Sequence, residues 1–294
     1  MAVTGRWQSA LIAAALFAVP AAASGLNGWT YRTQVGAARV EAERQALWEK
    51  MLSGKLDGGG AERLAALSVA EASSSASDYR RRWREVLRAR AAYKAEMDLI
   101  RGGGAYKPGR TEDRWLKNRA EATTPEARHL FEQVFLDQWQ QKYDPGLDRA
   151  GNVAVGALMH SEMQANYRSG TSWLKAVLTR IGWFDISRYG EEASQAAWLI
   201  VQHSDYDPEW QKRMLEVLEP RVKSGDMQGK YYAYLVDRVA SNAKRPQVYG
   251  TQGRCVGKGD WQPFEAVDPV KLDGRRREVG LEPIDDYRRR FTCP

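Results

Sequence analysis

"SQAAWLIVQHSDYDPEW", residues 194–210, decides the fold class of this 294-residue chain. Its apolar residues recur at three- and four-residue spacing, which is typical of an amphipathic helix, and we expect that helix to span residues 191–204. Asp207 and Pro208 then provide the N-cap and the first helical position of a second helix. Two helices joined by a short polar segment predict a helical domain.

Helical patterns continue on both sides of this stretch. Thr123 and Glu126 form a capping box with Pro125 in the first turn of one helix. Further helices are expected at residues 37–52, 79–100, 153–167, 173–181, 208–219 and 228–241. The chain is therefore predicted to be mainly α.

The C-terminal segment has a different character. "QVYGTQ", residues 247–252, and "WQPFEAV", residues 261–267, are typical of two short strands joined by a glycine-rich turn. Residues 271–279 favour a last short helix. We therefore expect a short C-terminal β-hairpin beside the helices.

A turn-rich stretch at residues 144–152 marks a boundary between two parts of the chain. The first part, residues 24–150, is predicted to be a helical N-terminal region. The second, residues 151–294, is predicted to be a helical domain that contains the hairpin.

The N-terminus has the pattern of a cleaved secretory signal peptide, residues 1–23. Arg6 precedes the apolar run "ALIAAALFAV", residues 10–19, and an A-x-A site follows, so cleavage is expected after Ala23. The run is shorter than the roughly twenty residues that span a bilayer, although an uncleaved anchor is the alternative. No later run is long and apolar enough to cross a membrane, so the mature chain is expected to be periplasmic or secreted.

The chain has two cysteines, Cys255 and Cys293. In an oxidising compartment an isolated pair is most simply one disulfide, with free thiols as the alternative. Neither cysteine has a helix N-terminus or a histidine beside it in sequence, which argues against a nucleophile.

The formal net charge is +7, and much of the positive charge is local. One predicted helix carries the arginines Arg80, Arg81, Arg82, Arg84, Arg88 and Arg90. They form either a solvated helix face or a surface for anionic envelope partners, such as phosphorylated lipids or polysaccharide. Nucleic acid is not expected as a partner, because the chain is predicted to be exported and has no recognised binding motif.

"GAYKPGRT", residues 104–111, matches a P-loop pattern except that Arg110 replaces the lysine. A P-loop follows a buried strand, whereas a charged helix precedes this stretch, and arginine does not replace the compact lysine ammonium. We interpret it as a turn and expect no cofactor.

His203 is the most informative histidine of the chain. It shares a helix stripe with Leu199 and Ile200, so we expect it to point partly inward near the end of its helix. It is either a core or capping residue, or a ligand-binding group or general base. Asp205 and Asp207 give a metal-like spacing, but Asp207 caps a helix and the ligands are too few, so no metal is predicted.

Asp237 and Arg238 are the charged residues of "YYAYLVDRVA", residues 231–240. On a helix their side chains diverge, so each needs its own partner if buried. They form either structural ion pairs or, in the case of Arg238, a clamp for an anion.

The segment "QVYGTQ" offers neutral hydrogen-bonding groups from Gln247, Tyr249 and Gln252. Such groups suit the hydroxyls and amides of sugars or peptides, and the alternative is that they satisfy the backbone of their own loop. Gly250 weakens a strand unless another backbone or a ligand approaches closely.

Residues 182–287 resemble a bacterial family known as domain of unknown function 6624. The matching pieces, in order, are "GWF", "SQAAWLIVQHSDYDPEW", "AYLVDRV", "RPQVYGTQ" and "RRREVGLEPIDDY". The resemblance implies a mainly helical domain and brings no established activity. Cys255 departs from the family pattern, and we interpret it as a local disulfide addition.

These features favour an exported helical protein that binds a polar envelope ligand or a protein partner through a C-terminal pocket. The residues expected to line it are His203, Asp205, Asp237, Arg238, Gln247, Tyr249 and Gln252. One alternative is an envelope hydrolase with His203 or an aspartate as acid or base and Arg238 stabilising negative charge. Another is a purely structural helical module, so the sequence leaves open whether the protein is an enzyme.

Overall fold

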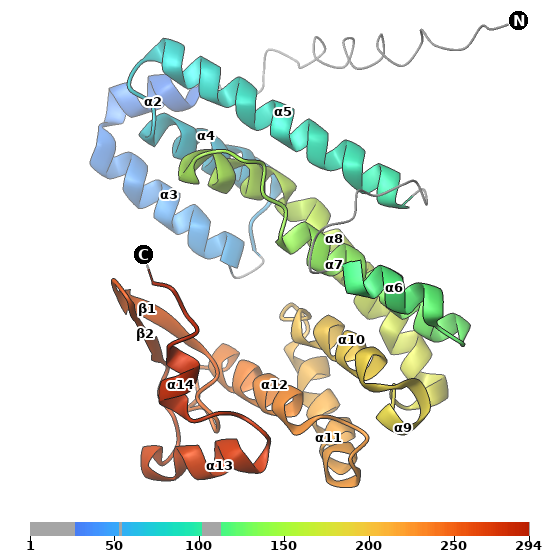
Figure 1. Ribbon diagram of the computed structural model, residues 1–294. Helices are drawn as coiled ribbons and strands as arrows, with labels where there is room; N and C mark the ends of the chain where they lie inside the picture. Colours follow the sequence, from blue (N-terminus) through green and yellow to red (C-terminus); the bar gives the residue numbers. More distant parts are fainter. Residues whose placement is uncertain (1–26, 53–54, 102–112, 294) are drawn as a thin grey trace, which may run out of the picture. The chain divides into compact units, whose positions relative to one another are not determined.

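The computed structural model describes residues 27–52, 55–101 and 113–293 and is predominantly helical (Figure 1). A two-stranded antiparallel hairpin lies near the C-terminus. The predicted mainly α fold with a short C-terminal β-hairpin is therefore confirmed. The predicted signal peptide and the P-loop-like stretch lie outside the described residues. Within the described ranges, no helix has both the length and the apolar character needed to cross a membrane.

The chain divides into two compact units. Unit 1 comprises residues 1–106 and 143–162, and unit 2 comprises residues 107–142 and 163–294. Helix α8, Arg149–Ile181, contributes to both units. The predicted boundary after residue 150 falls within the first turn of this helix.

The helices predicted at residues 153–167 and 173–181 are in fact one continuous helix, α8, of 33 residues. Gly170 does not interrupt it. The next residue, Thr171, is buried, and its hydroxyl lies 2.7 Å from the Ser204 hydroxyl. Tertiary packing at this point overrides the low helix propensity of glycine.

Unit 1 is built around α4, Gly58–Glu71, in which every residue from Leu64 to Ala70 is buried. Helices α2, Asn27–Val35, and α3, Ala37–Leu52, pack against it. Helix α5, Ala76–Arg101, also contacts α4, and Figure 1 shows α4 between α3 and α5. The α3 and α5 helices agree with the sequence prediction.

Unit 2 is a second group of helices, followed by the hairpin. Its helices are α6 (Asp113–Glu121), α7 (Pro125–Gln141), the later part of α8, α9 (Ile186–Tyr189), α10 (Glu191–Gln202), α11 (Pro208–Ser224) and α12 (Gly229–Asn242). Helix α10 packs against α7, and α11 packs against α12. Trp183 and Phe184 are fully buried in this unit.

Side-chain caps start two of these helices. Asp207 caps α11, as predicted, and accepts the N–H of Trp210 at 3.1 Å. Helix α7 is capped by Thr124, which accepts the N–H of Ala127 at 3.2 Å. The predicted capping box at Thr123 is therefore wrong by one residue.

The hairpin consists of β1, Gly253–Gly257, and β2, Asp260–Pro263. The strand predicted at residues 247–252 is wrong, because this segment is a loop in which Gln247 makes one isolated bridge to Ala266. Residues predicted as the turn form β1 instead. The backbone N–H groups of the loop are taken by a buried side chain, as described below.

The chain ends in short helical segments tied back to the hairpin. They are η2 (Pro269–Lys271), α13 (Leu272–Glu278) and α14 (Ile284–Arg288). Cys255 on β1 and Cys293 form a disulfide with Cα atoms 5.5 Å apart, which confirms the predicted pair. Helix α13 agrees with the predicted last helix.

Candidate functional site

His203 pairs with a carboxylate that the sequence did not single out. It is the C-cap of α10, and its Nδ1 lies 2.9 and 2.8 Å from the two carboxylate oxygens of Asp137 on α7. The Asp137 side chain is 8% exposed and that of His203 is 18% exposed. A buried carboxylate at Nδ1 fixes the ring orientation and favours a proton on Nδ1, so Nε2 is the ring nitrogen that can accept a hydrogen bond.

Neutral polar groups and an aromatic ring surround this pair. Gln138 donates to Asp137 at 2.9 Å, and the amide nitrogen of Gln141 lies 3.1 and 3.3 Å from the two ring nitrogens of His203. The ring of Tyr167 on α8 lies 5.8 Å from that of His203. We call Asp137, Gln138, Gln141, Tyr167 and His203 the His203 cluster. It combines amide donors, an imidazole and an aromatic face, the groups that recognise hydroxyls and amides.

The hydroxyl next to His203 in sequence is not a free nucleophile. Ser204 is fully buried, and its Oγ donates to the Ile200 carbonyl at 2.7 Å while also contacting the Thr171 hydroxyl. It ties α10 to α8. Ser204 is therefore not available as a nucleophile beside His203.

Asp205 and Arg238 form an ion pair of their own. Arg238 Nε donates to Asp205 at 3.0 Å and a second guanidinium nitrogen donates to the other carboxylate oxygen. Asn242 and Gln211 add donors at 2.8 and 3.2 Å. Burial acts to raise the pKa of Asp205, but the bonds from Arg238 outweigh it and hold that pKa below its usual value. The pair joins the turn after α10 to α12. The carboxylate of Asp205 thus occupies the guanidinium group of Arg238, which the sequence suggested as a clamp for an external anion.

Asp237 is fully buried and organises the loop that follows α12. Its carboxylate accepts the backbone N–H groups of Val248, Tyr249 and Thr251 at 2.8, 2.9 and 2.7 Å. Burial raises its pKa, opposed by these three hydrogen bonds. The same bonds explain why residues 247–252 do not form a strand, because their N–H groups point to a side chain instead of a partner strand.

The glutamines of this loop also serve its own backbone. Gln247 is fully buried, donates to the carbonyls of Gln252 and Phe264 at 2.9 and 3.1 Å, and accepts the Gln252 N–H at 2.7 Å. The Gln252 side chain donates to the Thr251 hydroxyl at 3.2 Å. Tyr249 is half-buried. These contacts support the backbone-satisfying alternative for Gln247.

Gly250 is required for the conformation of the loop. Its φ of +68° lies in the left-handed region, and a Cβ there would meet Ile284 and Leu272 at 3.4 and 3.5 Å. Among the described residues, the nearest groups are thus side chains at ordinary contact distance and not another backbone, so the positive φ is what selects glycine. The contacts thus divide the seven predicted site residues into three groups: His203, the Asp205–Arg238 pair, and the loop organised by Asp237.

Asp207 has a capping role and an ion pair. Besides capping α11 it accepts a bond from Lys175 at 2.5 Å, and these bonds lower its pKa against the effect of burial. Within the described ranges, no group of three or more His, Cys, Asp or Glu side chains could hold a metal ion.

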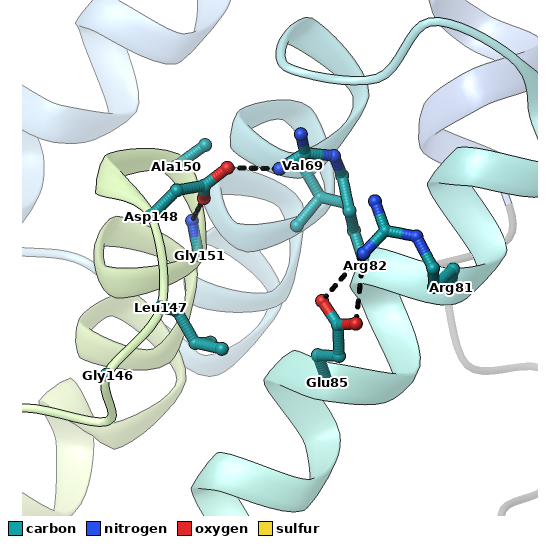
Figure 2. Close-up of a pocket in the computed structure, with 9 residues that line it drawn as sticks. All are labelled: Val69, Arg81, Arg82, Glu85, Gly146, Leu147, Asp148, Ala150 and Gly151. Carbon is teal, nitrogen blue, oxygen red and sulfur yellow. Dashed lines mark hydrogen bonds and ion pairs between the residues drawn. The ribbon is translucent and has the colours of Figure 1, made fainter.

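Unit 1 contains a cavity of about 380 Å³ that the sequence did not indicate (Figure 2). Its lining comes from α4, α5, the segment before α8 and the first turn of α8: Val69, Arg81, Arg82, Glu85, Gly146, Leu147, Asp148, Ala150 and Gly151. Figure 2 shows Arg81 bonded to Glu85 and Arg82 bonded to Asp148. The charges in its wall are therefore already paired.

A model of the family of unknown function DUF6624 matches residues 137–292. The match begins at Asp137 and takes in His203 and the loop organised by Asp237. It extends the resemblance inferred from the sequence at both ends. No curated protein and no solved structure matches the chain.

Proposed function

Because this chain belongs to DUF6624, a family of unknown function, we propose its function from its own geometry: it binds a polar ligand of the cell envelope at the His203 cluster. The ligand class is a glycan or peptide fragment that presents hydroxyl and amide groups. The protein acts in the periplasm or outside the cell.

The contact between His203 and the buried carboxylate of Asp137 carries the proposal. It holds the imidazole of His203, whose side chain is 18% exposed, in one orientation, with Nδ1 2.8 Å from a carboxylate oxygen. The exposed Gln141 and the partly exposed Tyr167 lie beside it. A pre-oriented imidazole, an amide and an aromatic face together match a ligand that is polar along its edges and apolar on its faces.

Two observations support an exported location. The N-terminal sequence has a basic residue, a short apolar run and an A-x-A site. The disulfide between Cys255 and Cys293 is the kind of bond that persists in oxidising compartments.

Binding is tested by titrating soluble glycan and peptide fragments of the envelope into the protein and following the histidine ring signals by NMR. The His203 signals should shift, and His203→Gln or Asp137→Asn should weaken binding about tenfold, because the first removes the ring that contacts the ligand and the second removes the carboxylate that orients it. His129→Gln is the matched control, because His129 lies on the helix that carries Asp137 and, like His203, pairs with a carboxylate, that of Glu132.

The control variant should bind like the wild type. If His203→Gln binds every fragment as well as the wild type does, the His203 cluster is not the binding site. If the fragments do not bind and His203→Gln mainly lowers the free energy of unfolding, the cluster is a structural contact between α7 and α10.

Hydrolysis of a glycan or peptide bond is the second candidate, and the orientation of His203 by Asp137 favours it. In this function His203 Nε2 takes a proton from water as the water oxygen attacks the scissile carbonyl or anomeric carbon, and Asp137 stabilises the resulting imidazolium. The imidazolium then returns the proton to the leaving amine or hydroxyl as the peptide or glycosidic bond breaks. The release of new reducing ends or amino groups from the fragments would then fall about 10² to 10⁴-fold in His203→Gln. Fragments that bind without being cut would exclude this candidate and leave the binding function intact.

A further inference from the structure

Three arginines form a row along the exposed face of α5. Arg80, Arg84 and Arg88 are all exposed and follow one another at four-residue spacing. At a rise of about 1.5 Å per residue, neighbouring Cα atoms lie roughly 6 Å apart, so the row covers about 12 Å of one helix face. We call these three residues the arginine row.

The structure separates the arginine row from Arg81 and Arg82 of the same helix. Arg81 is bonded to Asp78 and Glu85, and Arg82 to Asp78 and Asp148. In contrast, none of the described carboxylates forms an ion pair within 4.0 Å with any member of the row. The sequence suggested that all these arginines contact an anionic partner. The ion pairs leave the arginine row as the candidate for that contact.

The row is held on a firmly anchored helix. The opposite side of α5 buries Tyr79, Trp83 and Val86 in unit 1. The Nε of Arg84 donates to the Arg80 carbonyl at 3.3 Å, which orders the side chain without cancelling its charge. The three guanidinium groups are therefore available as cations on the solvent-exposed face of α5.

A large apolar side chain continues the same face. Leu99 is 48% exposed and lies about three helical turns after Arg88, so the two side chains project from the same side of α5. Exposed small residues, Ala91 and Ala92, lie between them. Cations followed by an apolar side chain on one helix face fit a membrane surface better than a polysaccharide, because a polysaccharide offers no apolar layer for leucine.

We infer that the arginine row and Leu99 form a docking surface for an anionic lipid membrane. Helix α5 lies along the headgroups, with the guanidinium groups on lipid phosphates and Leu99 at the boundary of the acyl chains. Lipid headgroups diffuse laterally, so they gather beneath the row without having to match its spacing. This function is independent of the His203 cluster, which belongs to unit 2.

The test measures partitioning of the purified chain onto vesicles of phosphatidylglycerol and phosphatidylcholine in equal parts. Changing all three members of the row to glutamine should lower the partition coefficient about 100-fold, from the contribution of each arginine near an anionic surface. The matched control is Lys212→Gln, Arg213→Gln and Arg245→Gln, which removes the same charge from exposed residues of unit 2. It should change partitioning by no more than about twofold if the arginine row itself, and not the net positive charge of the chain, holds the membrane.

Leu99→Ser separates a membrane from other polyanions. It should weaken vesicle binding several-fold and leave binding to a soluble phosphorylated polysaccharide unchanged. Equal binding of the row variant and the wild type would overturn the inference. So would equal binding to vesicles of phosphatidylcholine alone, or tighter binding to the polysaccharide than to the vesicles.

Discussion

Asp237 and Arg276 hold Tyr249 from the two ends of its backbone. The Asp237 carboxylate accepts the Tyr249 N–H at 2.9 Å, and Arg276 Nη1 donates to the Tyr249 carbonyl at 2.6 Å. Both charged side chains are fully buried. Burial raises the pKa of Asp237 and lowers that of Arg276, which shows that each charge is desolvated. Their hydrogen bonds to the backbone of the loop offset this desolvation cost. The loop, which the sequence suggested as a wall of a ligand site, connects α12 to β1 and is packed between Asp237 of α12 and Arg276 of α13.

Asp237→Asn should destabilise the protein by about 2 to 4 kcal/mol, because an amide has one acceptor oxygen for the three N–H groups and turns a donor toward one of them. Urea unfolding followed by circular dichroism measures the change. Asp285→Asn is the control, since the Asp285 side chain is 76% exposed, and it should cost less than about 0.5 kcal/mol. Equal effects of the two variants would mean that the Asp237 bonds do not hold the loop.

Gly250→Ala should cost about 1 to 2 kcal/mol, because alanine in the left-handed region brings its Cβ too close to the following carbonyl oxygen. Gly257→Ala provides the comparison: a Cβ at Gly257 meets nothing within 4 Å and its φ is not positive. The difference between the two unfolding free energies measures the cost of placing alanine in the left-handed backbone conformation. If Gly257→Ala is as harmful as Gly250→Ala, the positive φ is not what selects glycine in the loop.

The helical part of the fold could be predicted because its signals are local. Periodicity and the cap at Asp207 were sufficient for α10 and α11. The strand predicted at residues 247–252 failed because its N–H groups bond to Asp237, whose position in the fold follows from tertiary packing. Similarly, nothing within residues 153–181 indicates that Thr171 is buried and bonded to Ser204, which keeps α8 continuous.

Half of the His203 pair could be predicted from the sequence. His203 stood out by its place on a helix stripe, whereas Asp137 is 66 residues away on another helix. A signal for Asp137 was nevertheless present: it follows Leu130 and Val134 on the buried face of α7. A carboxylate on an apolar helix face requires a hydrogen-bonding or charged partner. This requirement makes Asp137 a candidate site residue before its partner is known.

Loss of the disulfide should destabilise unit 2 by about 3 to 4 kcal/mol, since the bond closes a loop of 38 residues in the unfolded chain. The measurement compares urea unfolding of the oxidised chain with that of the Cys255→Ser, Cys293→Ser double variant. Addition of reductant should reproduce the effect in the wild type and leave the variant unchanged. A reductant effect of equal size in the variant would show that the loss has another cause.

Asp78 should give the protein an acid-sensitive contribution to stability. The Ser74 N–H and the guanidinium groups of Arg81 and Arg82 lower the pKa of Asp78 from 3.8 to about 2. Because the folded-state pKa lies below the unfolded one, the stabilisation is fully present above about pH 4 and is lost as the pH falls toward 2. The difference in unfolding free energy between wild type and Asp78→Asn should therefore shrink across that interval. NMR titration of the Asp78 carboxyl group checks the cause directly, and a midpoint near 3.8 with a constant difference between the two proteins would refute it.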